Sequence, residues 1–484
     1  MNVAAGIAIV GLGPGRLEQL TLEAWRLLEA APETYLRTSR HPLVSELPTA
    51  TVHSFDRLYD EHAAFEEVYE AIAQRVLALG QRDEGVVYAV PGHPLVGETT
   101  VLRIRALAEA AGVPVRIVDG MSFCEPVLTA LNVDPLDGLQ ICDAMVLAQR
   151  LHPPLDPDVA VLIGQVFGRE LASELKMTLM HLYPDDHPVR LVRSAGTPQE
   201  VVVDGPLYAL DRRDDLDHLT SAYLPPLAKA GSLSTYQEIM AKLRAPDGCP
   251  WDREQTHATL RSSLLEETYE VLEALDADDM DELKEELGDL LLQVLFHAQI
   301  ATEDGDFRLI DSVGYAVEKL VRRHPHVFSS ETVQDSQEVL LNWEQIKRQE
   351  RGEETFKSML AGINKALPAL SQAHEVQKRV ARVGFDWPDV APVLDKVREE
   401  IDEFLDADQP QHRARELGDV LFSLVNLARW NAIEPESALR EATLRFTRRF
   451  EVIEREAVDK GQPLEEMTLE QMDAIWQRAK REEG

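Results

Sequence analysis

The sequence predicts a multidomain protein with an α/β N-terminal half and an all-α C-terminal half. Before about residue 225, short β-branched or apolar runs alternate with helical stretches, which is typical of α/β folds. After it, amphipathic helical stretches rich in Glu, Leu and Arg follow one another with little strand signal. The length of 484 residues exceeds one ordinary core and, at about 150 residues per domain, predicts three units.

In the first half, apolar runs predict strands and longer periodic stretches predict helices. The strands are expected at 7–10, 86–90, 115–118 and 159–163, and the helices at 20–30 and 64–79. Pro225-Pro226 and Gly231-Ser232 are typical of a linker. We therefore expect a domain at 1–225, a linker at 226–234, and two helical domains at 235–358 and 359–484.

Glycine-rich loops follow three of the predicted strands, at Gly11 to Gly15, Val90 to Gly97 and Asp119 to Phe123. Glycine permits tight turns and a close approach of the backbone to a ligand. Such loops can form a crevice at one edge of a sheet, or they can simply turn corners. The first loop is a weak dinucleotide-binding fingerprint, because Arg16 stands where a third glycine is expected.

The second half carries the pattern Glu-Glu-x-x-Glu followed by Glu-x-x-Asp twice. The copies are Glu266, Glu267, Glu270, Glu286 and Asp289, and Glu399, Glu400, Glu403, Glu416 and Asp419. Residues three and four apart share one face of a helix, so these carboxylates converge and repel unless a cation lies between them. Clusters of oxygen ligands suit Mg²⁺ or Mn²⁺, which commonly hold phosphates.

Each acid pattern is interrupted by a turn signal, at Asp276 to Asp279 in the first copy and at Asp406 to Gln411 in the second. Glu270 and Glu286 lie at similar distances from the first turn, about 10 Å along antiparallel helices. We therefore expect two helical hairpins, each with its acids facing one another at matching heights.

The helical half is an internal duplication that extends beyond the acids. Trp343 and Trp476 recur at the same offset as the first glutamates of the two acid patterns, and so do Lys347 and Lys480. Arg322-Arg323 likewise has a counterpart in Arg448-Arg449.

The stretch from Tyr236 to Lys480 resembles the MazG nucleoside triphosphate pyrophosphohydrolases. Besides Arg244, the matching motifs are Asp247 to Asp252, Leu265 to Val271, Arg322 to Phe328, Trp343 to Lys347 and Val383 to Trp387. The resemblance implies that the acids hold Mg²⁺ and that a nucleoside triphosphate (NTP) is cleaved to NMP and pyrophosphate. It also implies a broad or non-canonical range of NTPs.

The resemblance and the acid pattern together give candidate residues. The metal ligands are Glu267, Glu270, Glu286, Asp289, Glu400, Glu403, Glu416 and Asp419, with Glu266 and Glu399 as bases or outer ligands. Candidates for the β and γ phosphates are Lys242, Arg244, Arg323, Lys347, Lys378, Arg379 and Arg449. Trp251 is a candidate substrate contact, although Trp251, Trp343, Trp387 and Trp476 are better explained as core packing.

Both copies keep every acid, so one copy can be catalytic and the other a scaffold. The flanking Lys378, Arg379 and Arg382 favour the second copy as the catalytic one. The alternative to a hydrolase is an acid-rich helical interaction scaffold. Hairpins with an exposed apolar stripe commonly pair into bundles, and we expect a homodimer.

Residues 6 to about 225 resemble the tetrapyrrole methylases, two-lobed α/β enzymes that bind S-adenosylmethionine between their lobes. The motifs are Gly11 to Gly15, Pro91 to Gly97, Gly120 to Ser122 and Leu162 to Val166. The resemblance implies a cofactor site at Gly13, Pro14, Gly92, His93, Pro94, Ser122 and Gln165. Arg16 and His93 replace the aspartates usual in the family. Two alternatives stay open: a working methyltransferase, or a non-catalytic module that senses S-adenosylmethionine or a nucleotide.

The net charge limits the classes of partner, and the cysteine content indicates the redox compartment. The 85 acidic and 49 basic residues give a formal charge of -36, which disfavours nucleic acids and anionic membranes as partners. The three cysteines are widely spaced, which fits reduced thiols in a cytosol. No apolar run reaches the roughly 18 residues of a membrane span and the start lacks a signal-peptide pattern, so a cytoplasmic protein is expected.

Overall fold

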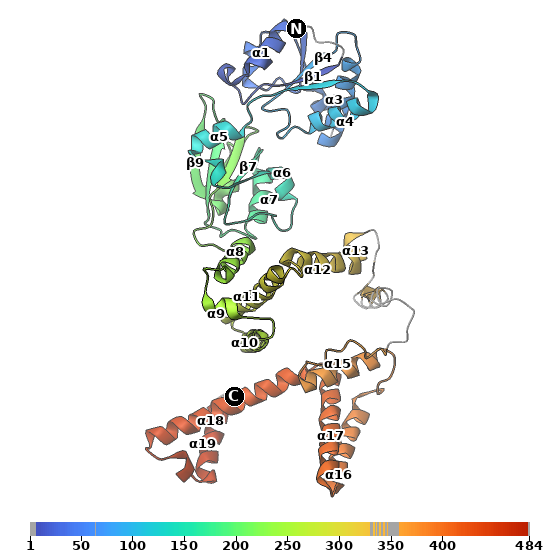
Figure 1. Cartoon of the computed structure of the whole chain (residues 1–484), viewed down its shortest axis with the longest axis vertical. Coiled ribbons are helices and arrows are strands. Elements are labelled where there is room, and N and C mark those ends of the chain that lie inside the picture. The colour runs from blue at the N-terminus through green and yellow to red at the C-terminus, as the bar shows by residue number, and fades with distance from the viewer. Residues whose placement is uncertain are drawn as a thin grey trace. The chain divides into compact units, whose positions relative to one another are not determined.

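A computed structural model describes residues 6–62, 64–329, 333, 335, 338–339, 342–343, 346 and 358–482 of the chain. The chain divides into two compact units, residues 1–242 and 243–484 (Figure 1). The division falls after Lys242, near the end of a helix, and therefore later in the chain than the predicted linker.

The first lobe of the N-terminal unit is built on a parallel five-stranded sheet. Its strands are β1 (Ile7–Gly11), β2 (Glu33–Leu36), β3 (Thr51–Ser54), β4 (Val86–Val90) and β5 (Val115–Val118), in the order β3-β2-β4-β1-β5. Strands β1 and β4 are buried at every position, because helices cover both faces of the sheet.

Alternate side chains of β1 and β4 enter different cores. One core joins these strands to α3 (Phe65–Gly80) and α4 (Thr99–Ala111), and the other joins them to α1 (Leu22–Ala30). The short helix α2 (Arg57–Glu61) precedes α3. Near-continuous apolar strands such as Val86 to Val90 are thereby explained, since side chains on both faces must be buried.

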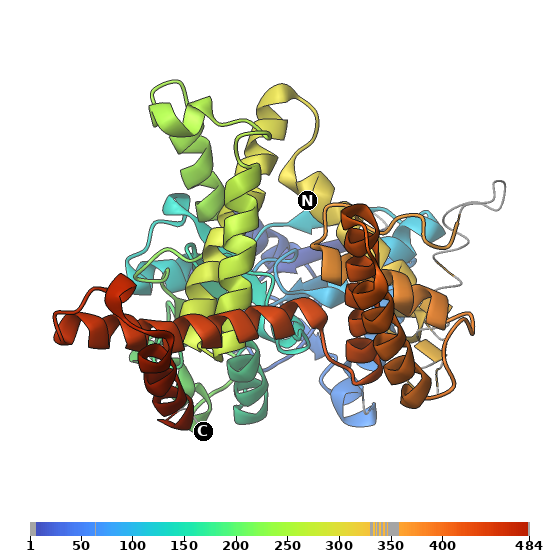
Figure 2. The same cartoon turned by 90° about the horizontal axis from the view of Figure 1, so that it is seen from below.

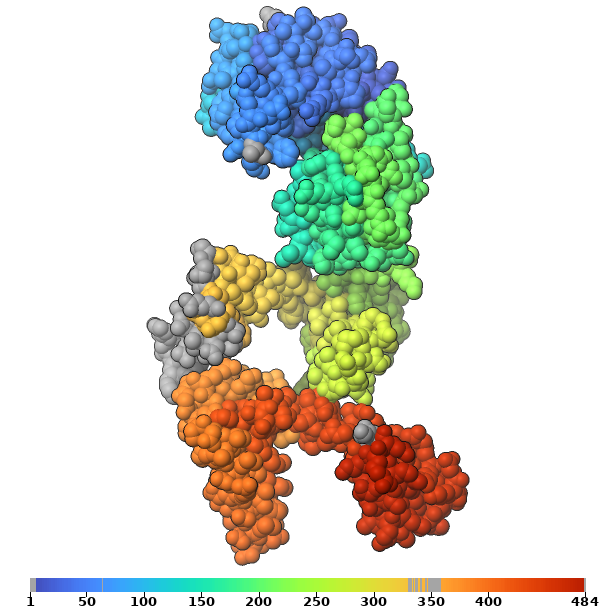
Figure 3. All heavy atoms as spheres, turned by 180° about the vertical axis from the view of Figure 1, so that it is seen from behind, coloured from blue at the N-terminus to red at the C-terminus, as the bar shows by residue number. Residues whose placement is uncertain are grey.

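The second lobe has a mixed sheet. Its strands are β6 (Leu139–Asp143), β7 (Ala160–Gly164), β8 (Pro188–Arg193), β9 (Val201–Pro206) and β10 (Thr220–Leu224), in the order β6-β7-β10-β8-β9. Strands β6 and β7 are parallel and the other neighbours are antiparallel. The two lobes are coloured blue and turquoise to green in Figure 3.

Helices cover this sheet as well. Helix α5 (Cys124–Leu131) packs in one core of the lobe, and α6 (Ala144–Ala148) and α7 (Arg169–Leu179) pack in another. The α/β fold predicted for the first half is confirmed, and the four predicted strands correspond to β1, β4, β5 and β7.

Asp158 fixes the start of α8 (Leu233–Arg244) to the first unit. Its carboxylate accepts hydrogen bonds from the backbone N–H groups of Gly231 and Ser232, at 2.9 and 3.0 Å, and from the hydroxyl of Thr235 at 2.5 Å. These bonds outweigh the effect of burial and lower the pKa of Asp158 to about 2. The end of the predicted linker is therefore held by a charged hydrogen-bond acceptor.

The described residues after 242 form helices and contain no strand, which confirms the all-α prediction. The helices of the first repeat are α9 (Pro250–Glu254), α10 (Arg261–Ala277), α11 (Met280–Asp304), α12 (Leu309–Arg323) and α13 (Pro325–Phe328). Those of the second repeat are α15 (Ala369–Ala381), α16 (Val390–Asp406), α17 (Pro410–Trp430), α18 (Pro435–Asp459) and α19 (Leu469–Glu482).

Both predicted hairpins are present. Helix α10 ends at a left-handed Asp278 with φ 54°, and Asp279 caps α11 by accepting hydrogen bonds from two backbone N–H groups. Helix α17 begins with Pro410 in its first turn, where the missing N–H costs nothing. Helices α16 and α17 lie side by side, in orange in Figures 1 and 2.

Among the helices that the structure describes, none combines the length and hydropathy that a bilayer crossing requires.

Candidate functional site

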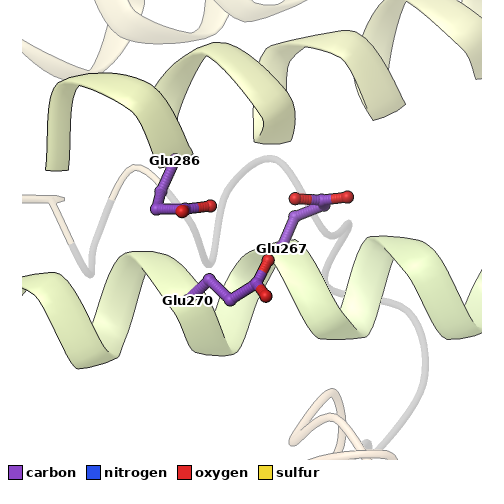
Figure 4. A group of neighbouring side chains, drawn as sticks. All are labelled: Glu267, Glu270 and Glu286. Carbon is purple, nitrogen blue, oxygen red and sulfur yellow. The ribbon is translucent and has the colours of Figure 1, made fainter. Parts of the chain in front are cut away.

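The first acid cluster joins two helices across a hairpin. Glu267 and Glu270 project from α10 and Glu286 projects from α11, with one carboxylate oxygen of each within 4.8 Å of the others (Figure 4). Loss of water and the neighbouring carboxylates raise the pKa values of Glu267 and Glu286. Within the part of the chain that the structure describes, no ion pair neutralises these three acids.

The second cluster repeats the arrangement. Glu400 and Glu403 on α16 and Glu416 on α17 also bring one oxygen each within 4.8 Å of the others. Glu400 and Glu416 are buried. Loss of water and the charge of Glu400 raise the pKa of Glu403.

The structure thus brings together three of the four predicted ligands in each copy. Asp289 and Asp419 lie outside these groups, although Asp289 is close enough to raise the pKa of Glu267. Glu266 is exposed. Closely spaced carboxylate oxygens from separate helices fit a hard divalent cation, whose charge removes their mutual repulsion.

The second cluster contains a cation that the first one lacks. Lys396 Nζ lies 2.7 Å from Glu400 Oε1 and 3.0 Å from Glu399 Oε1. Its counterpart in the first copy, three residues before the first glutamate of the pattern, is Ser263. His412 Nε2 also lies 3.0 Å from Glu416 Oε1. Sequence reasoning missed Lys396, although a lysine four residues before a glutamate on a helix is a recognisable signal.

In the first cluster a neutral amide takes the place of that lysine. Gln293 Nε2 donates a hydrogen bond to Glu267 Oε1 at 3.5 Å. Gln293 is only 5% exposed, and its Oε1 is buried without a hydrogen-bond partner among the described residues.

Arg244 contacts protein groups in this structure, and its contact with phosphate stays a prediction. Its guanidinium binds the carboxylate of Glu303 through two nitrogens and donates to the carbonyls of Asp252 and Gln255. The side chain is 7% exposed and lies over the ring of Phe296. A buried guanidinium with these partners holds the α9 segment against α11.

The other predicted phosphate contacts are spread over the helical repeats. Arg379 donates to the carbonyls of Met359, Ala361 and Gly362, and Lys378 Nζ lies 3.4 Å from Glu375. Lys242 is exposed on α8. Lys347 lies outside the described residues.

A cation–π contact recurs in both repeats. Arg323 lies over Trp343 with 5.8 Å from guanidinium carbon to ring centre, and Arg449 lies over Trp476 at 5.5 Å. The predicted duplication therefore extends to tertiary contacts. Trp251, by contrast, is 61% exposed, so core packing does not account for it.

The first unit contains a cavity of about 360 Å³. It lies beside the loops that follow β1 and β4, where Gly13 and Gly92 exchange backbone hydrogen bonds of 2.9 and 3.2 Å. A Cβ added to Gly120 would lie 2.4 Å from the carbonyl oxygen of Gly92. The three glycine loops therefore meet, and at Gly120 only glycine allows that approach.

The predicted cofactor residues divide into two sets. Gly13, Pro14, Gly92, His93 and Gln165 line the cavity, whereas Pro94 and Ser122 are not among its lining residues.

Ser122 instead belongs to the start of α5, where its hydroxyl donates to Glu125 at 2.6 Å and accepts from the N–H of Cys124. His93 Nε2 lies 3.4 Å from a carboxylate oxygen of Asp119.

An ion pair at the cavity, between the partly buried Arg37 and the buried Glu98, was missed by sequence reasoning. Arg37 Nε lies 3.1 Å from Glu98 Oε1, and both residues line the cavity. Burial raises the pKa of Glu98 to about 7 although Arg37 opposes the shift, and burial lowers the pKa of His41 to about 4. Gln165 and Ser194 also line the cavity with positive φ values of 65° and 51°, which is strained for residues with a side chain.

Comparisons with known proteins match the α/β part and the helical part of the chain to two different families. Residues 6–211 match the family described as tetrapyrrole (corrin/porphyrin) methylases, and residues 255–328 match the MazG nucleotide pyrophosphohydrolase domain. An uncharacterised protein of Bacillus subtilis, YabN, is 44% identical over 99% of both chains.

Two enzymes resemble the C-terminal half. The nucleoside triphosphate pyrophosphohydrolase/pyrophosphatase MazG of Thermotoga maritima is 47% identical over 50% of this chain and 93% of its own. The nucleoside triphosphate pyrophosphohydrolase of Escherichia coli K12 is 48% identical over 51% of this chain and 95% of its own.

Proposed function

The chain belongs to the YabN-like family, with an N-terminal tetrapyrrole methylase domain and a C-terminal MazG region, and from this premise we propose that its C-terminal half is a divalent-cation-dependent NTP pyrophosphohydrolase. It converts an NTP, in a broad or non-canonical range, to NMP and pyrophosphate. The observation that carries the proposal is the pair of acid clusters, each with three carboxylates from two helices within 4.8 Å.

The carboxylates have distinct tasks in this reaction. Glu267, Glu270 and Glu286 hold the ion in the first copy, and Glu400, Glu403 and Glu416 hold it in the second, with Asp289 and Asp419 as outer ligands. When bound, Mg²⁺ or Mn²⁺ supplies positive charge that polarises the phosphate and makes water a better nucleophile. Glu266 or Glu399 accepts the proton of the attacking water while the oxygen bonds to the α-phosphorus and the bond to the pyrophosphate oxygen breaks.

We assign catalysis to the second copy and a supporting role to the first, within domains at 359–484 and 235–358. The support for this assignment is Lys396, whose positive charge lies at the second cluster and can meet a polyphosphate. Lys378 and Arg379 support the assignment less strongly than expected from the sequence, because Glu375 contacts Lys378 and backbone carbonyls contact Arg379.

The test is to incubate the full chain with Mg²⁺ and single NTPs and to identify the products. NMP with pyrophosphate is expected, whereas NDP with phosphate would contradict the reaction, and no turnover of any NTP would favour an acid-rich scaffold. Glu403→Gln should lose on the order of 100-fold in kcat/KM, because it removes one of the three carboxylates that hold the ion. Glu270→Gln is the matched control in the other copy, and an equal loss there would contradict the assignment.

For the N-terminal half we propose binding of S-adenosylmethionine in the glycine-lined cavity. The support is the meeting of the Gly13, Gly92 and Gly120 loops at a cavity of about 360 Å³, within the usual range for small-molecule sites. Calorimetric titration with S-adenosylmethionine tests binding. A methyl-transfer assay then separates an enzyme from a module that senses S-adenosylmethionine. Absence of affinity contradicts both of these and leaves a module that senses a nucleotide.

We also propose a homodimer. Helix α12 exposes apolar side chains along its length, with Ile310 70%, Tyr315 68% and Leu320 53% exposed. A second copy that pairs helices across these faces would remove them from water. Sedimentation equilibrium should give twice the mass of one chain, and a monomer mass at micromolar concentration would refute the dimer.

A further inference from the structure

The two acid clusters are alike in their carboxylates and differ in the groups that contact them. In the second, the ammonium of Lys396 lies 2.7 Å from Glu400 and 3.0 Å from Glu399. In the first, the equivalent position is Ser263, and Glu267, the counterpart of Glu400, accepts a hydrogen bond from the amide of Gln293 at 3.5 Å. The second cluster is therefore partly neutralised by a lysine, whereas no ion pair among the described residues neutralises the first.

This difference bears directly on cation binding, because an ammonium and a divalent ion need the same carboxylate oxygens. Glu400 is 6% exposed, so its oxygens have little access to water and few alternative partners. A cation that enters the second cluster therefore competes with Lys396 for the carboxylate of Glu400. In the first cluster it needs to displace only a neutral amide at long hydrogen-bond distance.

The glutamine adds an independent sign that the first cluster accepts a further polar group. Gln293 is buried, and its Oε1 has no hydrogen-bond partner among the described residues. A buried acceptor without a donor costs free energy unless a ligand or an ordered water satisfies it. The residue at the same position of the second copy, seven after Glu416, is Ser423, whose side chain is shorter than that of Gln293.

We propose that Lys396 is a built-in competitor for the divalent cation, so that the free ion loads the first cluster at lower concentration than the second. The second cluster then takes its ion together with a polyphosphate, which gives the displaced ammonium a new anionic partner. The inference rests on the proposed function only in treating both clusters as cation sites. In this inference Lys396 is a positioning residue, and the first cluster is the one that binds the cation without nucleotide.

The experiment measures Mn²⁺ binding without nucleotide, by calorimetry and by the loss of the free-ion paramagnetic resonance signal. In the full chain, the Glu403→Gln variant keeps the first cluster intact, so Mn²⁺ binding at that cluster is measured. The Glu270→Gln variant likewise keeps the second cluster intact. In the Glu270→Gln background, Lys396→Met should tighten Mn²⁺ binding on the order of tenfold, which corresponds to about 1.4 kcal/mol. Lys396→Arg, which keeps the charge, should leave the affinity low.

The reciprocal change is made in the first cluster. In the Glu403→Gln background, Ser263→Lys should weaken Mn²⁺ binding by a similar factor, and Ser263→Thr is the neutral control. Circular dichroism melting curves check that each variant is folded; if Ser263→Lys does not fold, the Lys396→Met pair of measurements still decides. A non-hydrolysable triphosphate analogue should tighten Mn²⁺ binding more at the second cluster than at the first.

The outcomes separate this inference from the proposed activity. Equal Mn²⁺ affinity of the two clusters, or no change on Lys396→Met, overturns the competition even if NMP and pyrophosphate are formed. A tenfold difference between clusters in a protein that hydrolyses no NTP supports the competition and refutes the activity. Failure of both clusters to bind Mn²⁺ overturns both.

Discussion

Replacing Arg244 by Met tests whether this residue is structural. The substitution removes the ion pair with Glu303 and the bonds to the carbonyls of Asp252 and Gln255, and it keeps a flexible apolar side chain near Phe296. We expect the helical half to be destabilised and the KM for NTP to stay within about twofold, because the guanidinium is committed to protein groups.

The magnitude follows from these contacts. Bonds from a charged donor contribute about 1.5 to 3 kcal/mol, and Glu303 is 36% exposed, so its share is reduced by solvent screening. The substitution also leaves the carbonyls of Asp252 and Gln255 unpaired beside the site of the Arg244 side chain, which is 7% exposed. The free energy of unfolding is therefore expected to fall by about 3 kcal/mol.

A double-mutant cycle with Glu303→Gln isolates the ion pair, for which a coupling of about 1 kcal/mol is expected. The assay is urea unfolding followed by the helical circular dichroism signal of the full chain. Arg244 lowers the pKa of Glu303, so this contribution is present above the ordinary glutamate pKa and is lost as pH falls through the lowered value. A loss below about 0.5 kcal/mol with a KM raised tenfold would refute the structural role and restore the phosphate contact.

Three other predictions follow from single contacts. Asp158→Ala should increase proteolysis between Leu224 and Leu233, because the N–H groups of Gly231 and Ser232 lose their acceptor. In the wild type these hydrogen bonds persist until the pH falls below the ordinary aspartate pKa toward the lowered pKa of about 2. Cleavage of the variant equal to that of the wild type at pH 7 would contradict this role of Asp158. Gly120→Ala should weaken S-adenosylmethionine binding at least about tenfold by calorimetry, since its Cβ would lie 2.4 Å from the Gly92 carbonyl oxygen. Gly205→Ala is the control, because a Cβ there meets nothing within 4 Å and the backbone has no positive φ. Mn²⁺ binding at the first cluster should weaken at a higher pH than an ordinary carboxylate site, because the pKa values of Glu267 and Glu286 are raised and protons compete with the ion; affinity constant down to pH 5 would count against this.

Much of the fold was predictable because its signals are local. The buried strand Val86–Val90 is apolar at all positions, and the turn at Asp278 and Asp279 carries the residues that a left-handed cap and a helix N-cap require. Strands β2, β3, β6, β8, β9 and β10 were not predicted; Glu33–Leu36 and Thr51–Ser54, for example, are short and partly polar. The strand state of β2 and β3 depends on pairing with neighbouring strands, β2 with β4 and β3 with β2, which local sequence does not encode.

The candidate sites show the same division. That acids three and four apart share a helix face is a property of helical periodicity, so the convergence of Glu267, Glu270 and Glu286 could be predicted. The roles of the basic residues could not. Arg244 faces Glu303 from a distant part of the chain, and the Arg37–Glu98 pair joins the segments after β2 and before α4.

The sequence alone determined the family, through the resemblance of its motifs. It also determined the two halves, the hairpins and the acids that face one another across them, because periodicity, turn residues and repetition can be read along the chain. Only the tertiary structure decided which charges are neutralised. Coulomb interactions depend on separation in space and on access to water, so Lys396 beside Glu400 and Ser263 in the matching position become different electrostatic sites only once the helices are packed.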